Sequence, residues 1–283
     1  MRVRKALPVI PFVLGTFVCA AAQAQTEPAA TKFTVGVKVW HADWLSYIPA
    51  SYSGIGANGA PAIGDSVNLA EGTAHTDVFP LLQVRHRDFF ASLSHARFNS
   101  DFRVQTSPVV LPTGQTVITS RNDHFKRRES DLNLGWFLTP EFAVALGYKD
   151  ATETRDTSLG IAPQSMPLTK TTARGFLLGA LGSFALVDKL RLYAQAGYGP
   201  ARLKVSFSDP KVASISSNGR YFIGELGVSY PIFSRPDGSM SATTTLGYRT
   251  QTIKTDSSGG FFQESHDLRD VRDGVILSLN VTM

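Results

Sequence analysis

The last ten residues of the chain, GVILSLNVTM (274–283), decide its fold. Apolar residues stand at every second position from Val275 to Met283, and most of the positions between them hold small or polar residues. A period of two is typical of a β-strand with one apolar and one polar face, because successive side chains of a strand point in opposite directions. The same pattern recurs when the chain is read backwards from this strand.

Ten segments of the chain show this alternation. From Phe142 to Tyr148, Phe, Val, Leu and Tyr alternate with Ala, Ala and Gly, and from Phe33 to Val39 a Phe and three Val alternate with Thr, Gly and Lys. Long stretches with the helical period of 3.6 do not recur, so the sequence predicts an all-β protein. The predicted strands are roughly 32–45, 76–86, 89–98, 128–138, 142–152, 173–186, 189–205, 220–233, 240–253 and 273–283.

The connections between these strands are alternately short and long. The tight connections are 87–88, 139–141, 187–188 and 234–239, and the long polar ones are about 46–75, 99–127, 153–172, 206–219 and 254–272. This alternation is typical of an up-and-down barrel in a membrane, and a tilted strand needs ~9–11 residues to cross the apolar core. In lipid every backbone polar group must be paired, which requires the sheet to close. We therefore predict a single antiparallel transmembrane β-barrel of about ten strands, with eight or twelve as alternatives.

Two segments fit this pattern least well. The segment 89–98 begins with Phe89 and Phe90, which place an aromatic ring on both faces of the strand. The stretch from Gly175 to Val187 is nearly apolar throughout, so a buried helix is the alternative to a strand there. Outward aromatic residues near segment ends are typical of the girdles at membrane interfaces. They are Phe33, Phe142, Tyr148, Phe184, Tyr198, Phe222, Tyr230 and Tyr248.

The N-terminus reads as a secretory signal. Arg2, Arg4 and Lys5 precede a broken apolar stretch, and Ala22-Gln-Ala24 matches a cleavage site. We predict a signal peptide over 1–24, a short lead over 25–31 and the barrel over 32–283. The only cysteine, Cys19, lies in the signal. The mature protein would have none, which excludes disulfide scaffolds, Cys-ligated zinc and thiol nucleophiles.

Composition excludes several other classes of protein. Of the 283 residues, 43% are hydrophobic and only 18% are charged, which argues against intrinsic disorder. The body of the chain has no apolar run of ~18 residues, so a helical membrane protein is excluded. The net charge of +5 comes from 28 basic and 23 acidic residues; without the three basic residues of the signal, 25 against 23 leave about +2. Nucleic-acid binding through a basic surface therefore has little support.

These features together resemble the bacterial outer-membrane β-barrels. The resemblance covers the signal, the hairpins over nearly all of 32–283, and the segment from Leu134 through Pro140 to Tyr148, which is similar to a strand–turn–strand of small barrels of this group. Family members commonly end in an aromatic residue within a strand read by the barrel-assembly machinery, and here the last residue is Met283. The resemblance implies a location in the outer membrane of a Gram-negative envelope, reached through the periplasm. It implies outer-membrane lipids, lipopolysaccharide and the assembly machinery as partners, and no cofactor.

Candidate catalytic residues lie at the predicted outer ends of the first two strands. In strand number the chain resembles the omptin proteases, which use acidic residues and an Asp/His pair at the outer rim. The corresponding pairs here are His41 with Asp43 and His75 with Asp77. A histidine beside a carboxylate can activate water. The alternation places the first pair outward and the second inward, so the two pairs need not converge. Polar residues at a membrane boundary are the alternative interpretation.

A second enzyme class on this architecture is the lipid A deacylases, which resemble esterases with a Ser/His pair. Ser92, Ser94 and His95 are the closest match in this chain. A serine and a histidine that are adjacent in a strand point to opposite faces, which weakens the match. The sequence shows neither a dense carboxylate cluster for calcium nor a set of histidines for a transition metal, so no metal site is predicted.

Polar residues at inward positions predict a network inside the barrel. They are Lys38, Gln83, Lys149, Arg191, Gln195, Glu225 and Arg249. Arg191, Glu225 and Arg249 fall on neighbouring strands and could form a charge network. Such a network is either a plug that stabilises the barrel or a narrow polar path. A barrel of eight strands is just filled by side chains, so ten strands lie near the filled end of the range.

A basic cluster stands where the second long loop meets the fourth strand. Arg121, Lys126, Arg127 and Arg128 are candidates for contact with lipopolysaccharide phosphates, because guanidinium groups match phosphate geometry. A solvated loop base is the alternative. Overall we expect a non-enzymatic surface or structural barrel, or a narrow pore for small polar solutes. An outer-membrane hydrolase with a rim active site is the alternative function, and a secreted soluble barrel that holds a small ligand is a third class.

Overall fold

The computed structural model describes residues 31–49, 51–52, 69–106, 109–110, 116–117, 120–159, 165–208, 210, 213–255 and 269–283. The predicted signal peptide (1–24) lies outside these residues. The predicted lead (25–31) does so as well, except for Thr31, where the first strand begins.

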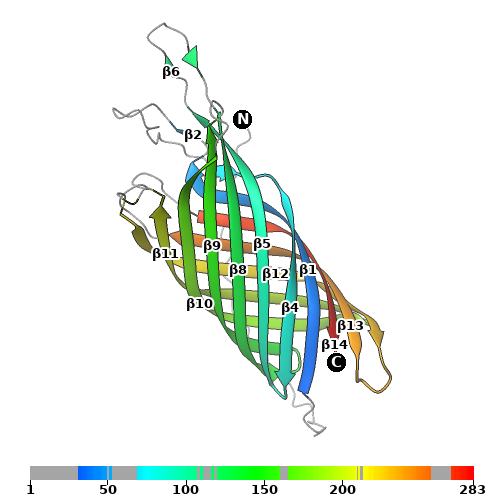
Figure 1. Cartoon of the computed structure of the whole chain (residues 1–283). Coiled ribbons are helices and arrows are strands. Elements are labelled where there is room, and N and C mark those ends of the chain that lie inside the picture. The colour runs from blue at the N-terminus through cyan, green and yellow to red at the C-terminus, as the bar shows by residue number, and fades with distance from the viewer. Residues whose placement is uncertain are drawn as a thin grey trace. The chain divides into compact units, whose positions relative to one another are not determined.

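Ten long strands form one closed sheet (Figure 1). They are β1 (Thr31–Pro49), β4 (His75–His86), β5 (Phe89–Thr106), β8 (Ser120–Thr139), β9 (Phe142–Leu159), β10 (Ser165–Val187), β11 (Leu190–Phe207), β12 (Ile215–Ser234), β13 (Ser241–Thr255) and β14 (Arg269–Thr282). Each is antiparallel to the next, and β14 pairs with β1. Four short strands are β2 (Ser51–Tyr52), β3 (Leu69–Glu71), β6 (Val109–Val110) and β7 (Thr116–Val117). The predicted up-and-down barrel of ten strands is confirmed, and the alternatives of eight and twelve are wrong.

The first and last strands close the barrel. Val35, Val37 and Val39 lie opposite Val281, Leu279 and Leu277 in an unbroken antiparallel register. At the end of the seam Phe33 and Met283 exchange both backbone hydrogen bonds, at 2.7 and 2.8 Å. The C-terminal strand therefore supplies the pairing that removes the free sheet edges, as the membrane requires.

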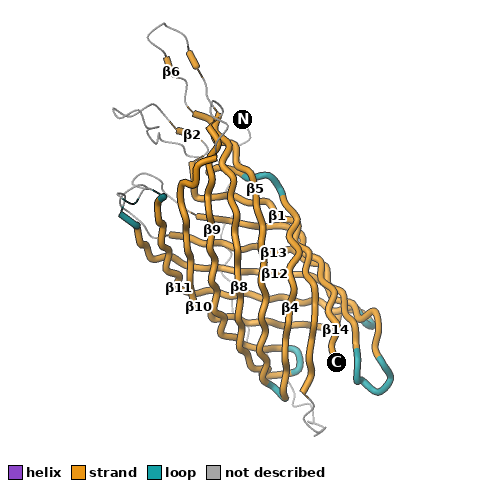
Figure 2. Tube along the Cα trace, viewed as in Figure 1, coloured by secondary structure: helices purple, strands orange, loops and turns teal. Residues whose placement is uncertain are grey.

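The tight turns gather at one end of the barrel, which we call the turn side; the longer connections join the strands at the opposite end, the loop side. Two-residue turns link β4 to β5, β8 to β9 and β10 to β11. Arg87 (φ 54°) and Asp188 (φ 45°) adopt left-handed conformations in two of them, and Gly238 (φ 69°) does so in the turn between β12 and β13. Figure 2 shows these turns in teal at the ends of almost continuous strand.

The strands are longer than predicted on the loop side. The segment predicted over 128–138 is the end of β8, which begins at Ser120, and β10 begins at Ser165, before the predicted start at 173. The predicted loops 99–127 and 153–172 are therefore wrong over much of their length. The reason is a change in the outward face: in these parts it is polar and charged, whereas Phe102 and Phe125 point inward and are buried beside paired charges such as Arg127. The alternation of inward and outward side chains continues, but the outward face is polar, as in a barrel surrounded by water.

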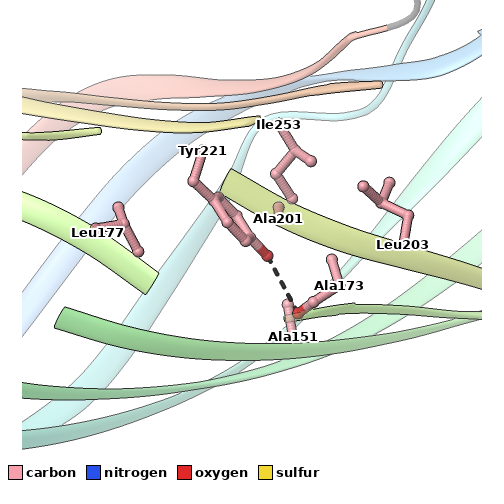
Figure 3. Packing of buried hydrophobic residues seen from close by; sticks show 7 residues of the cluster. All are labelled: Ala151, Ala173, Leu177, Ala201, Leu203, Tyr221 and Ile253. Atoms are coloured by element: carbon pink, nitrogen blue, oxygen red, sulfur yellow. Dashed lines mark hydrogen bonds between the residues drawn. The ribbon is translucent and has the colours of Figure 1, made fainter. Parts of the chain in front are cut away.

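The apolar stretch from Gly175 to Val187 is strand rather than helix, so the alternative interpretation is wrong. Its apolar residues serve both faces: Phe176 and Leu178 point outward, and Leu177 is buried in the barrel. Gly175 permits a close approach between strands, because a Cβ there would lie 2.5 Å from the backbone oxygen of Pro200. Figure 3 shows Leu177 in an inner cluster with Ala151, Ala173, Ala201, Leu203, Tyr221 and Ile253.

An apolar belt surrounds the turn-side half of the barrel. Its large outward and exposed members are Phe33, Val35, Val37, Val78, Leu82, Phe89, Leu93, Leu132, Leu134, Trp136, Leu138, Phe142, Leu146, Phe176, Leu178, Phe184, Leu186, Tyr198, Phe222, Leu226, Tyr230, Ile232, Leu246, Tyr248, Val275, Leu277 and Leu279. Toward the loop side the outward face becomes polar. His95, Ser130, Asp150 and Arg174 mark this change on β5, β8, β9 and β10, and each lies directly opposite the next.

Candidate functional site

The candidate site is the lumen, because all seven predicted inward residues point into it. Glu225 is the centre of one cluster: it accepts hydrogen bonds from Arg249 (3.0 Å), Gln195 (2.7 Å) and the Tyr193 hydroxyl (3.0 Å). Lys38 Nζ lies 3.9 Å from the Glu225 carboxylate. Sequence reasoning missed Tyr193, although its position two residues before Gln195 on the same strand places it inward as well.

A second cluster crosses the barrel. Lys149 on β9 pairs with Glu129 (2.8 Å) and Asp131 (2.6 Å) on β8. Gln251 on β13 donates to Glu129 at 2.8 Å. Four strands (β9, β10, β11, β12) separate β8 from β13 in one direction, and four (β5, β4, β1, β14) separate them in the other. The bond from Gln251 to Glu129 therefore spans the lumen from one wall to the opposite wall.

Two of the predicted lumen residues, Arg191 and Gln83, lie outside these two clusters. Arg191 does not reach Glu225; it donates to the backbone oxygen and hydroxyl of Ser183, at 3.4 and 3.2 Å, close to a tight turn. Gln83 lines a cavity on the turn side. The predicted interior charge network therefore includes Glu225 and Arg249 but not Arg191.

Arg127 lies inside the barrel and is only 2% exposed. Its guanidinium group lies 2.6 Å from Asp270 on β14 and 2.7 Å from Glu129. Trp44 Nε1 donates to the other oxygen of Asp270 at 2.8 Å. As a lipopolysaccharide contact the prediction for Arg127 is wrong, because strand alternation turns it away from the membrane, between the outward Lys126 and Arg128.

The outward members of the same predicted cluster are exposed. Lys126 pairs with Asp156 at 3.3 Å, and Arg128 lies opposite Arg97 on β5. The side chain of Arg121 lies outside the described part of the structure.

Aromatic rings fill the loop-side half of the lumen around the buried charges. Trp44 contacts Phe98, Phe102 and Phe125 edge-on, with ring centroids 5.5, 5.2 and 5.7 Å apart. The guanidinium group of Arg272 lies 3.4 Å from the centre of the Phe98 ring. Cations over ring faces are attracted by the ring quadrupole, and the attraction grows when water is excluded. These rings and charges form a plug, whose least exposed side chains are Trp44, Phe102, Phe125, Tyr221, Gln251, Asp123, Asp270 and Arg272.

The plug perturbs the acid–base behaviour of its charged groups. Burial lowers the pKa of Arg272 to about 10, although Glu129 and Asp77 oppose this effect. Burial alone would raise the pKa of Glu129, but Lys149 and Arg127 hold it well below its ordinary value. Both groups are therefore ionised at neutral pH, and the plug consists of paired charges rather than neutral hydrogen bonds.

The candidate catalytic pairs lie on opposite faces of the wall. His75 and Asp77 point inward, with His75 Nε2 3.3 Å from the Asp77 carboxylate. Arg272 pairs with that carboxylate and lies 2.9 Å from His75 Nε2. His41 points outward and bonds to the Thr76 hydroxyl at 2.9 Å, and Asp43 is also outward. The two pairs do not converge.

No Ser/His pair forms among the esterase candidates. Ser92 and Ser94 point inward. His95 points outward and bonds to the Ser130 hydroxyl at 2.9 Å. The described residues contain no group of three or more His, Cys, Asp or Glu side chains suited to a metal ion. In this part of the chain there is also no helix with the length and hydropathy needed to cross a membrane.

A cavity of about 280 Å³ lies on the turn side of the polar clusters. Lys38, Asp131, Lys149 and Arg249 line it at the level of those clusters. Apolar side chains form much of the remaining wall: Phe79, Leu81, Phe90, Phe137, Leu177, Leu181 and Ile223. The lumen is thus hollow on the turn side and filled on the loop side.

Neither a protein-family model nor a curated protein matches this sequence. Solved structures do resemble the chain. It is 10% identical to the outer membrane protease OmpT from Escherichia coli, with 92% of this chain and 98% of that one covered and a TM-score of 0.48. For Neisserial surface protein A the identity is 14%, the coverage 89% and 96%, and the TM-score 0.35. The Pseudomonas putida toluene transporter TodX is 8% identical, with 90% of each chain covered and a TM-score of 0.32. The closed antiparallel barrel of this chain rests on its own strand pairing, from β1 through β14 and back to β1.

Proposed function

We propose that this chain is a non-enzymatic outer-membrane barrel with a closed lumen. Its turn-side half spans the bilayer, and its loop-side half projects from the membrane as a filled cylinder that serves as a surface or structural element. The observation that carries this proposal is the coincidence of two changes along the same strands. Where the outward face passes from apolar to charged, the lumen passes from hollow to filled.

The apolar belt supports the membrane location. Leu178 is 72% exposed, and large apolar side chains on all ten long strands share its outward orientation. Soluble proteins rarely expose continuous apolar surfaces of this extent. On β10 the belt runs from Phe176 to Leu186, which matches the ~9–11 residues that a tilted strand needs to cross a bilayer. A secreted soluble barrel would need a polar exterior at these positions.

The plug supports a closed lumen rather than a pore. A side chain less than 2% exposed touches essentially no water, and Trp44, Tyr221, Gln251 and Arg272 all meet this limit within the lumen. Paired buried charges such as Arg127 with Asp270 at 2.6 Å occupy the same part of the lumen. This disfavours the narrow pore.

The geometry of the histidines supports a non-enzymatic role over a rim hydrolase. A general base must be free to accept a proton from water near the substrate. Asp77 is 4% exposed, and its carboxylate is engaged by Arg272 and His75. His75 in turn stacks on Phe98, with ring centroids 5.5 Å apart.

Planar-bilayer recordings of the purified, refolded protein test this proposal. We expect no stable conductance steps from the native protein at any voltage. A variant with Trp44→Ala, Arg127→Ser and Gln251→Ala removes three plug side chains, and it is expected to conduct, which shows that the assay detects an opened barrel. Stable ohmic conductance of the native protein would contradict a closed lumen.

A further inference from the structure

A buried carboxylate in the lumen faces more cations than it can bond directly. Glu225 Oε2 accepts hydrogen bonds from Arg249 at 3.0 Å and from Gln195 at 2.7 Å. Because these donors occupy the two lone pairs of that oxygen, Lys38 Nζ remains 3.9 Å away and forms no hydrogen bond with the described residues. Arg249 is 7% exposed, and its Nε has no hydrogen-bond partner within the same part of the chain. One carboxylate therefore serves two cations, and both of them line the cavity.

The wall formed by β8 and β9 has the opposite balance of charge. Lys149 there lies 2.6 Å from Asp131 and 2.8 Å from Glu129, so one cation serves two carboxylates. Glu129 is also paired with Arg127 of the plug at 2.7 Å, whereas Asp131 lines the cavity. An anion in the cavity is therefore attracted to the two cations beside Glu225 and repelled by Asp131.

Two arginines point into the lumen near the turn-side rim. Arg85 donates to the backbone oxygen of Arg87 at 2.9 Å, and its guanidinium group lies 3.9 Å from the centre of the Phe137 ring. Arg191 donates only to the uncharged oxygens of Ser183. Neither arginine forms an ion pair with the described residues. The acidic residues nearby stand in the two-residue turns rather than at inward strand positions: Asp88, Glu141 and Asp188. Openings lined by one sign of charge concentrate ligands of the opposite sign, so these arginines favour the entry of an anion.

Between the charged groups and the rim, the cavity wall is mainly apolar. Phe90 and Phe137 line it with ring centroids 5.4 Å apart. Phe90 is the second residue of β5, and Phe137 is the third from the end of β8, so the cavity extends to the turn-side rim. Its volume of about 280 Å³ lies just below the ~300–1,000 Å³ that is typical of small-molecule sites. The cavity therefore suits a small ligand with a charged end and an apolar end.

We propose that this cavity binds a small monocarboxylate with an apolar tail. Its carboxylate lies against Lys38 and Arg249, and its tail extends along Phe90 and Phe137 toward the turn-side rim. Hydrogen bonds from ammonium and guanidinium groups to a carboxylate are roughly twice as strong as neutral ones, and the apolar wall removes the tail from water. Within the closed lumen proposed above, the ligand enters and leaves on the turn side. The site goes beyond the proposed function, because a structural barrel needs no ligand.

Calorimetric titration of the refolded barrel in phosphatidylcholine nanodiscs tests the site, with empty nanodiscs as the reference for partition into the bilayer. The probes share one tail and differ in the charge of the head: octanoate, octan-1-ol and octylammonium. We expect octanoate to bind at one site, at least roughly tenfold more tightly than octanol. Octylammonium should bind no more tightly than octanol. From pentanoate to octanoate, each added methylene should tighten binding by up to roughly fourfold.

Lys38→Met separates the charge of the site from the shape of the cavity. It removes the ammonium group but keeps an unbranched side chain, and Glu225 retains its bonds from Arg249 and Gln195. Octanoate should bind at least roughly tenfold more weakly, because a charge-assisted contact is lost, whereas the affinity for octanol should not change. The matched control is Lys204→Met, which removes the same charge from an exposed outward position and should leave both affinities unchanged.

Asp131→Asn should change the affinity in the opposite direction. It removes the carboxylate that repels an anion in the cavity, while Lys149 keeps Glu129 at 2.8 Å. Octanoate should therefore bind roughly threefold more tightly, and octylammonium should bind more weakly. A merely apolar cavity would show neither change.

Heat-modifiable gel migration verifies that each variant folds, and the comparison of the three probes on the native protein needs no variant. Equal affinities for octanoate and octanol, tighter binding of octylammonium, or equal effects of Lys38→Met and Lys204→Met would overturn the proposal. If octanoate fails to bind a native protein that does not conduct, the site is refuted but the closed lumen is not. A native protein that binds octanoate and also conducts would refute the closed lumen alone.

Discussion

Arg127→Met tests whether the plug is a network of paired buried charges. Arg127 lies near three carboxylates: Asp270 at 2.6 Å, Glu129 at 2.7 Å and Glu153 at 3.7 Å. After the substitution Glu129 keeps Lys149 at 2.8 Å, whereas Asp270 keeps the neutral indole of Trp44. Asp270 thus loses its closest cation and Glu153 loses a guanidinium group 3.7 Å away, and breaking a buried ion pair by removing one partner costs about 3–5 kcal/mol.

The assay is equilibrium unfolding in urea of the refolded barrel, with the folded fraction read from heat-modifiable gel migration. Arg128→Met is the matched control, because the adjacent residue has the same chemistry but points outward, and it should change the unfolding free energy by less than about 0.5 kcal/mol. Adding Asp270→Asn to Arg127→Met should recover part of the loss, with a coupling of ~1–3 kcal/mol. Equal effects of Arg127→Met and Arg128→Met would refute the account of the plug.

Three further substitutions extend the test to other parts of the barrel. The lowered pKa of Glu129 stabilises the fold at pH values above the ordinary value of 4.5, and this contribution disappears as the pH falls below it. Glu129→Gln should therefore reduce the unfolding free energy at pH 7 and flatten the acid side of its pH profile, measured by urea unfolding. An unchanged profile would count against the ion pairs. Leu277→Arg places a charge on the belt and should cost about 2–4 kcal/mol in lipid. Thr252→Arg on the loop side, where no charge lies directly opposite, should cost little; similar costs would argue against the membrane boundary. Gly175→Ala forces a Cβ against the Pro200 oxygen and should cost about 1–3 kcal/mol in the same unfolding assay; a neutral effect would show that the two strands can separate there.

The strand number and the inward or outward side of each residue could be predicted from the sequence. The alternation in β14 and β9 follows from local strand geometry alone, because successive side chains point to opposite faces. A shift of one residue would reverse every inward and outward assignment. For this reason the alternation puts Lys38, Glu225 and Arg249 on the inward face, and their side chains lie close together there. The partners across the lumen could not be predicted, because they depend on which strands face each other after closure, as with Gln251 and Glu129.

The length of the strands could not be predicted from the pattern of lipid-facing residues. On the loop side the inward positions hold aromatic residues mixed with paired charges, and the outward positions are polar, so the sequence there resembles a polar loop when the search is for an apolar exterior. Phe98 and Phe102, four residues apart on β5, contain the missing signal, since aromatic residues at every second or fourth position within polar sequence indicate a strand with a buried face. Arg127 is a charged residue on the inward face, and its place in the lumen depends on carboxylates of its own and other strands that the local pattern does not show.

The central claim is that the turn-side half of the barrel lies in the membrane and the loop-side half in water. The depth in the bilayer of single outward residues along β10 tests it most directly. The described barrel contains no cysteine, so a fluorophore can be attached at Lys170→Cys, Thr172→Cys, Leu178→Cys or Phe184→Cys and quenched by brominated lipids or by aqueous iodide. The account predicts quenching by lipid at 178 and 184, quenching by iodide at 170 and 172, and a boundary between 172 and 178. Iodide access at all four positions, or lipid access at 170 and 172, would contradict a barrel that is half in the membrane and half in water.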